Sequence, residues 1–204
     1  MAINDDVCKV IIENVELLEA APLIVDEIEK KIFKAIDQKF EEMYGSREGW
    51  KGIFTYHEDA DDAETTFAPH DWPENEEGEY KAYFSFSHND EEMEYYLTAL
   101  MGKHPQAAFG IYFCVDYGYF GLKKAQWKTL LAKEYYDTKE IQDAVVLDED
   151  TLFIPVTLDD RQVSEEYPDF DQSLKPLQTA LHHLSRITPY VDTIVKKLKA
   201  QVVR

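Results

Sequence analysis

The triplet Glu79-x-Lys81 is the feature of the sequence that most directly suggests catalysis, because acidic residues that include Asp61 and Asp71 precede it. Two carboxylates on neighbouring strands can hold Mg²⁺ while a lysine stabilises the charge at an attacked phosphate. The spacing therefore predicts, as one hypothesis, a metal-dependent hydrolase or nuclease that uses Asp61 or Asp71 together with Glu79 and Lys81.

The composition of the chain weakens the enzyme hypothesis. With 22 Glu and 17 Lys in 204 residues, about two Glu-x-Lys triplets are expected by chance, and the chain has two. A nuclease must also hold a polyanion, yet residues 52–102 contain fourteen acids and one Lys, which would repel phosphate. The sequence has no GxSxG, no P-loop and no GxGxxG pattern. We therefore expect neither an enzyme nor a bound cofactor.

The histidines and cysteines lack the spacing of metal ligands. His57, His70 and Asp71 could ligate a metal if they folded together, but no HxH or HxxxH pattern occurs, and surface histidines are the simpler interpretation. Cys8 lies in an amphipathic segment and Cys114 in the apolar run FGIYFCV. We expect both to be reduced residues of the core, without a disulfide or a metal.

Residues 58–79 form the most acidic stretch, EDADDAETTFAPHDWPENEEGE, with ten Asp or Glu and no Lys or Arg. A solvated loop is the ordinary explanation of such a run. A binding surface is favoured here because Phe67 and Trp72 lie among the acids as aromatic anchors, and because the loop is long for a compact domain. The predicted partner-binding residues are Asp59, Asp61, Asp62, Glu64, Phe67, Asp71, Trp72, Glu74, Glu76, Glu77, Glu79, Asp90, Glu91 and Glu92.

The charge of the whole chain indicates the class of partner. A formal net charge of −20 repels nucleic acid and anionic lipid, because affinity for phosphate comes mainly from Lys and Arg. A basic surface on another protein would relieve the self-repulsion of the acidic stretch. We therefore expect a non-enzymatic acidic protein that engages a basic protein, for instance a nucleic-acid-acting enzyme, as an inhibitor, an immunity factor or a nucleic-acid mimic.

The location of the protein follows from its hydropathy. No apolar run approaches the roughly 20 residues that a bilayer span needs, and the N-terminus begins acidic where a signal peptide is basic. We expect a soluble, cytoplasmic protein. Its hydrophobic content of 45% is ample for a folded core.

Hydrophobic periodicity predicts a single acidic α+β domain over residues 1–204. The N-terminal helical segment, 1–44, follows a helical stripe over 4–44 that Pro22 should interrupt. This segment could pack on its own domain, or it could make the protein a homodimeric scaffold by pairing through residues 23–44.

The rest of the chain divides into a sheet region, 50–158, and C-terminal helices, 173–204. Strands are expected at 50–56, 80–88 and 107–116 and in a hairpin formed by DAVVL and TLFIPVTL, where Pro155 indicates an edge strand. Helices are expected from Asn89 to Gly102, at about 122–136, at 176–187 and at 189–202. Grouped strands with helices at both ends favour a mainly antiparallel sheet of about five strands.

Overall fold

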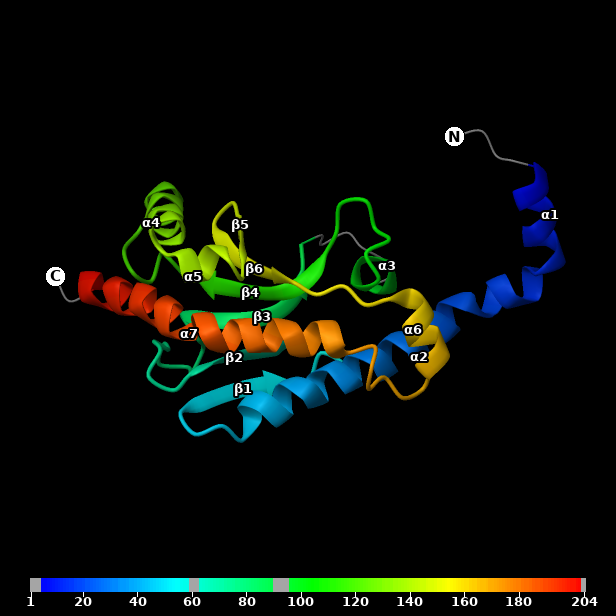
Figure 1. Ribbon diagram of the computed structural model, residues 1–204, viewed down its shortest axis with the longest axis horizontal. Coiled ribbons are helices and arrows are strands. Elements are labelled where there is room, and N and C mark those ends of the chain that lie inside the picture. The colour runs from blue at the N-terminus through cyan, green and yellow to red at the C-terminus, as the bar shows by residue number, and fades with distance from the viewer. Residues whose placement is uncertain (1–4, 59–62, 90–95, 203–204) are drawn as a thin grey trace.

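The structure is a computed structural model of the chain, and it describes residues 5–58, 63–89 and 96–202 (Figure 1). The helices are α1 (Asp5–Glu13), α2 (Val15–Phe40), α3 (Tyr96–Leu100), α4 (Lys124–Asp137), α5 (Lys139–Gln142), α6 (Asp160–Glu166) and α7 (Lys175–Val202), and a π-helical turn, η1 (Glu41–Gly45), follows α2. The strands are β1 (Trp50–Phe54), β2 (Thr65–Pro69), β3 (Ala82–His88), β4 (Phe109–Val115), β5 (Val146–Asp148) and β6 (Thr151–Pro155).

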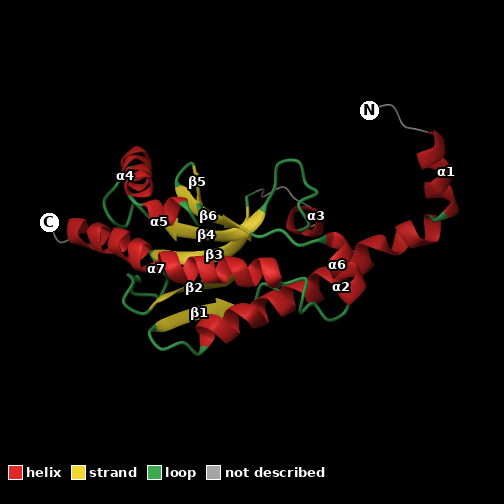
Figure 2. Cartoon of the chain, in the orientation of Figure 1, coloured by secondary structure: helices red, strands yellow, loops and turns green. Residues whose placement is uncertain are grey.

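These six strands form one antiparallel sheet in the order β1-β2-β3-β4-β6-β5. The longest pairing joins β3 to β4, from Ala82 opposite Val115 to His88 opposite Phe109. Helices α1 and α2 precede the sheet and α7 follows it (Figure 2). The predicted α+β class, with its antiparallel sheet between N-terminal and C-terminal helices, is confirmed.

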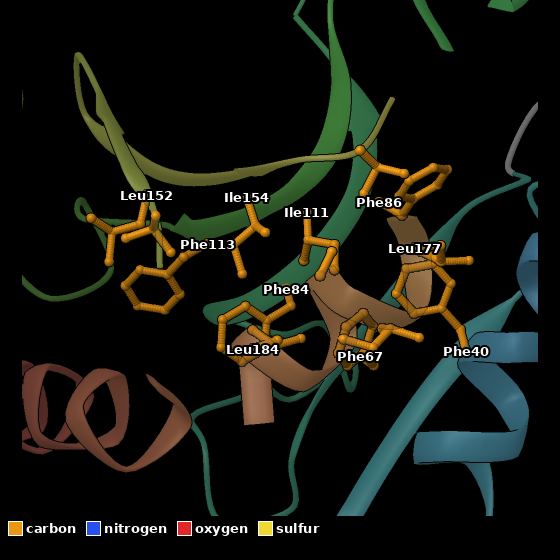
Figure 3. Packing of buried hydrophobic residues seen from close by; sticks show 14 of the residues in the cluster. Phe40, Phe67, Phe84, Phe86, Ile111, Phe113, Leu152, Ile154, Leu177 and Leu184 are labelled. Carbon is orange, nitrogen blue, oxygen red and sulfur yellow. The ribbon is translucent and has the colours of Figure 1, made fainter. Parts of the chain in front are cut away.

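One face of the sheet packs against α2 and α7 and forms the core. In β3 buried and half-buried residues alternate, because successive side chains of a strand point to opposite faces. Figure 3 shows Phe67, Phe84 and Phe113 of the sheet gathered with Phe40 of α2 and Leu184 of α7. The helices contribute these buried residues: Ile32, Phe33, Ile36 and Phe40 from α2, and Leu177, Leu181, Leu184, Ile187, Val191, Ile194, Val195 and Leu198 from α7.

The opposite face carries one row of side chains that crosses all six strands. The register places in this row Ile53, Thr66, Ser85, Tyr112, Phe153 and Val146. At its centre the rings of Tyr112 and Phe153 stack with their centroids 4.5 Å apart. At its ends Ile53 and Val146 are 45% and 50% exposed. We call this the open face of the sheet: it is exposed at the outer strands, although Thr66, Tyr112 and Phe153 within the row are buried.

Two predicted helix boundaries are wrong. The N-terminal segment is interrupted at Asn14, whose side-chain amide donates to a carbonyl one turn earlier, whereas exposed Pro22 lies inside α2. The C-terminal segment is one helix that continues through Pro189. Burial along α7 from Leu177 to Leu198 stabilises the helix by more than the loss of one hydrogen bond costs.

The sheet corrects two further predictions. β2 lies inside the stretch that was expected to be a loop, so the sheet has six strands. β6 is not an edge strand, because it lies between β4 and β5. Proline has no N–H to donate to a neighbouring strand. Pro155 is tolerated in β6 because β5 pairs with β6 only as far as Phe153, so no hydrogen bond to β5 is lost at Pro155.

The remaining expected elements agree with the structure within a few residues, and the start of the helix expected from Asn89 lies outside the described residues. No described helix is both long enough and apolar enough to cross a membrane. Both cysteines are free, as expected, but each is only half-buried. Cys114 is on the open face of the sheet and Cys8 is on α1, so neither belongs to the core.

A buried carboxylate joins α2 to the hairpin of β1 and β2. Asp37 is 2% exposed, and it accepts hydrogen bonds from the backbone N–H of His57 at 3.0 Å and from the hydroxyl of Thr65. The Nδ1 atom of His57 lies 2.7 Å from the oxygen that accepts the backbone bond. One side chain thus holds the helix against the chain segments that leave β1 and enter β2.

Substitution of this carboxylate should destabilise the whole fold. Asp37→Ala leaves the Thr65 hydroxyl and the His57 N–H without their acceptor, and we expect the free energy of unfolding to fall by about 3 kcal/mol. Urea denaturation followed by tryptophan fluorescence measures the change. Asp26→Ala on the same helix is the control, because it removes only an exposed pair with Lys30 and should cost no more than about 0.5 kcal/mol. Equal effects of the two substitutions would contradict this role for Asp37.

Candidate functional site

A pocket of about 600 Å³ lies on the open face of the sheet, between β1, β2, β3, β4 and the loop that precedes β3. Three of the predicted partner-binding residues, Glu64, Glu77 and Glu79, line this pocket. Asp116, which follows β4, adds a fourth carboxylate. The other lining residues are Ile53, Thr66, Gly78, Tyr80, Lys81, Tyr83, Cys114 and Val115. Acidic residues that are far apart in the sequence therefore converge on one concave site.

The outer wall of the pocket is a tight turn between β2 and β3. An isolated antiparallel bridge joins Glu74 to Tyr80 and closes the turn. The Asn75 side-chain oxygen accepts hydrogen bonds from the backbone N–H groups of Glu77 and Glu79, at 3.1 and 2.8 Å. Asn and Gly are the residues that such a turn favours, and Gly78 adopts φ +87° in it. The turn therefore holds the two glutamates at the rim of the pocket.

Among the described residues, the one cation that lines the pocket is held by the pocket's own acids. The Lys81 amine lies 3.3 Å from a Glu79 carboxylate oxygen and 3.5 Å from an Asp116 oxygen. Desolvation favours the neutral amine, but the hydrogen bonds to Glu79 and Asp116 outweigh it and raise the pKa of Lys81. Lys81 therefore carries its charge at neutral pH, and four carboxylates against one ammonium give the lining a formal charge of −3.

The floor of the pocket holds a buried hydroxyl without a partner. Thr66 is 4% exposed, and its Oγ1 atom has no hydrogen-bond partner in the part of the chain that the structure describes. This oxygen is also shielded from solvent, so it is a buried polar group of the sheet beneath the pocket lining. Its missing hydrogen bond costs free energy.

The remaining polar groups of the floor stay protonated. Burial is the largest cause that raises the pKa of the Tyr83 hydroxyl to about 12, and the neighbouring Cys114 and Glu64 add to it. Burial also raises the pKa of the Cys114 thiol to about 12, although a hydrogen bond to Tyr83 acts in the opposite direction. A thiol in this state is a poor nucleophile at neutral pH. Carboxylates therefore line the rim of the pocket, while the hydroxyl and the thiol on its floor are uncharged at neutral pH.

The prediction that Phe67 and Trp72 are aromatic anchors of a binding surface is wrong. Phe67 is fully buried in the core, and Trp72 is 3% exposed and donates its indole N–H to Asp192 of α7 at 3.2 Å. The alternation of β2 directs Phe67 towards the helices and the neighbouring Thr66 towards the pocket. The aromatic rings at the pocket are instead those of Tyr80 and Tyr83.

The other predicted partner-binding residues do not all lie at the pocket. Glu74 pairs with Lys51, whose amine also lies 5.0 Å from the centroid of the Tyr80 ring. Glu76 is exposed in the turn. Asp71 lies beside α7, where its carbonyl accepts a hydrogen bond from Lys199. Asp59, Asp61, Asp62, Asp90, Glu91 and Glu92 lie outside the described residues.

The residues of the alternative metal site do not meet within the described chain. Asp71 is on the α7 side of the sheet, whereas Glu79 and Lys81 line the pocket on the open face. His57 contacts Asp37, and the His70 ring contacts the backbone carbonyl of Trp50. Over residues 5–58, 63–89 and 96–202, no group of three or more His, Cys, Asp or Glu is arranged to hold a metal ion.

Sequence reasoning missed Asp116, Thr66 and Tyr83. Asp116 directly follows the apolar strand FGIYFCV, and a charge at the end of a central strand was an available signal. Thr66 and Tyr83 could be found only once β2 was recognised, because the pairing of Thr66 with Ser85 sets the register of the pocket floor.

Comparison with known proteins gives no precedent for this site: no family model matches the chain, and neither does any curated protein or solved structure. The function must therefore be inferred from the geometry and the charge of the pocket.

The environment of Cys114 predicts an inert thiol. In a Cys8→Ser variant, which leaves one thiol, iodoacetamide at pH 8 should react with the folded protein at least about a hundredfold more slowly than with the urea-unfolded chain, because the thiolate fraction falls tenfold per pKa unit. Mass spectrometry measures the rates, and the unfolded chain is the control. A folded-state pH profile with its midpoint near that of the unfolded thiol would contradict the assignment.

Proposed function

We propose that the protein is a non-enzymatic acidic binding protein that engages a basic surface on another protein through the pocket on the open face of its sheet. The observation that carries this proposal is the convergence of Glu64, Glu77, Glu79 and Asp116 on one concave site. A partner that inserts a cationic side chain would neutralise these carboxylates. This neutralisation would favour the complex.

The shape of the site supports arginine as the inserted side chain. A guanidinium group presents several N–H donors in one plane and pairs with carboxylates through two parallel hydrogen bonds. It also stacks on aromatic faces, which the Tyr80 and Tyr83 rings at the pocket would provide. A lysine ammonium is a compact point charge and uses fewer of these contacts.

The charge of the whole molecule supports a protein partner with a basic surface. The net charge of −20 would steer a positively charged protein towards the pocket and would repel nucleic acid. Basic surfaces with exposed arginines are common where proteins contact phosphates. An inhibitor, an immunity factor or a nucleic-acid mimic directed against such a protein would therefore have this combination of overall charge and acidic pocket.

Titration with a single arginine tests the pocket directly. In two-dimensional NMR, N-acetyl-arginine amide should give saturable shifts at Thr66, Tyr80 and Tyr83, whereas the citrulline analogue, which lacks the positive charge, should not. Neutralising the rim with Glu64→Gln, Glu77→Gln, Glu79→Gln and Asp116→Asn should weaken the binding at least about tenfold, since each lost contact to a charged group costs about 1 kcal/mol or more.

A second variant separates the pocket from the general negative charge. Glu48→Gln, Asp137→Asn, Glu140→Gln and Asp169→Asn remove the same four charges from exposed positions outside the pocket, and arginine binding should be nearly unchanged. Basic proteins captured from a lysate should then be lost with the rim variant and retained with this control. Equal binding of citrulline and arginine, or equal losses in the two variants, would contradict the proposal.

A further inference from the structure

The N-terminal helices expose an unusual amount of aliphatic surface. Eight large aliphatic residues between Val10 and Ile24 are 43% to 75% exposed: Val10, Ile11, Ile12, Val15, Leu17, Leu18, Leu23 and Ile24. Figure 1 shows α1 and the first part of α2 projecting from the body that contains the sheet. A contiguous apolar patch of several hundred Å² on a soluble chain indicates an interaction site. We name residues 5–28 the arm.

The composition and spacing of the arm indicate that another helix covers it. Within α2, Leu17 and Ile24 are seven residues apart, and so are Leu18 and Val25. Aliphatic residues at this spacing lie on one side of a helix, as they do in helices that pack against each other. The arm has no aromatic residue and no Arg, which are the residues that dominate transient recognition surfaces.

The arm continues into an apolar groove on the same molecule. Helices α2 and α6 border a groove of about 710 Å³ in which Leu23, Ile24, Ile28 and Val163 provide aliphatic surface and Tyr167 an aromatic wall. Two of the groove's charged or polar groups already have partners within the chain. Lys31 donates to the Tyr167 hydroxyl at 2.7 Å, and Asp160 pairs with Lys103 at 3.2 Å. The groove therefore offers mainly apolar surface to an incoming helix.

The charge of the arm argues against a membrane as its covering surface. Between residues 5 and 24 the chain has five acids and one Lys. Helices that lie on membranes carry Lys and Arg on their polar face, because anionic lipid attracts basic residues and repels acidic ones. Aliphatic residues at this spacing are suited to contact with a helix of another protein chain.

We propose that the arm is covered by the arm of a second copy of this chain, in a two-fold symmetric dimer in which each arm also reaches the α2–α6 groove of the other copy. The chain itself contains both an apolar helix and an apolar groove next to it, so one symmetric contact would cover both surfaces twice. Stable interfaces bury on the order of 800 Å² per partner, and dimers that persist are the more apolar ones. The aliphatic residues of the arm supply a large part of that area.

The proposal places the dimer contact earlier in the chain than the sequence-based prediction, which put it at residues 23–44. Ile32, Phe33, Ile36 and Phe40 are buried in the protein's own core and are not available to a second copy. The exposed aliphatic residues lie before them, between Val10 and Ile24.

Sedimentation velocity of the full chain at micromolar concentrations tests this interface. The unmodified chain should sediment as a dimer. Leu17→Glu with Leu18→Glu places four carboxylates in the symmetric contact and should weaken dimerisation at least about a hundredfold, or about 2.7 kcal/mol. Lys9→Glu is the matched control, because it changes the charge by the same amount on the polar side of the arm and should remain dimeric. Leu17→Met with Leu18→Met should also remain dimeric.

The folding of each variant is followed by circular dichroism and by the arginine titration described above, which reports on the pocket and not on the arm. An unmodified chain that is monomeric at these concentrations would overturn the proposal. A dimer that survives the double glutamate substitution in a folded protein would also overturn it, because the contact would then lie elsewhere.

Discussion

Phe67 is the residue on which the arrangement of the molecule most depends. It comes from the middle of the acidic stretch, yet its ring contacts the rings of Phe40, Tyr44 and Phe84 in the core, at centroid distances of 5.3, 4.6 and 5.7 Å. Burying a side chain of this size stabilises the fold by roughly 2 kcal/mol or more. The acidic stretch is therefore anchored to the sheet at its centre.

The strand geometry of this anchor also creates the pocket. Because side chains alternate along β2, directing Phe67 into the core directs Thr66 to the open face, and the chain enters β2 from Glu64 at the pocket rim. Trp72 fixes the other end of the segment against α7. The turn that carries Glu77 and Glu79 is held between these anchors and β3, so packing on one face of the sheet positions the charges on the other.

Much of the fold was predictable from the sequence because its main signals are periodic. The alternation of Tyr80 to Phe86 and the apolar run around Ile111 predicted two central strands, and the long helical stripe that includes Ile36 predicted α2. The segment TTFAP was not predicted, because Pro69 and the surrounding acids suggested a loop, although adjacent β-branched residues and a Phe also favour a strand.

The candidate site was only partly predictable, because sequence does not give the register between strands. The acidity around Glu77 and Glu79 was evident, but only the pairing of β3 with β4 brings Asp116 near Lys81. The aromatic anchors were misassigned for a related reason. Without the direction in which a side chain points, an aromatic residue among acids cannot be distinguished from a core residue that belongs to an unrecognised strand.

Lys81 competes with any incoming cation for the carboxylates of the pocket. Its amine already lies between Glu79 and Asp116 and is tethered there by the chain, so a cation from solution must compete with it for both carboxylates. A simple monovalent ion gains little by replacing it. Under the proposed function, a ligand that offers several donors and a flat ring-stacking surface would gain more, and the internal counterion would make the acidic pocket select by shape.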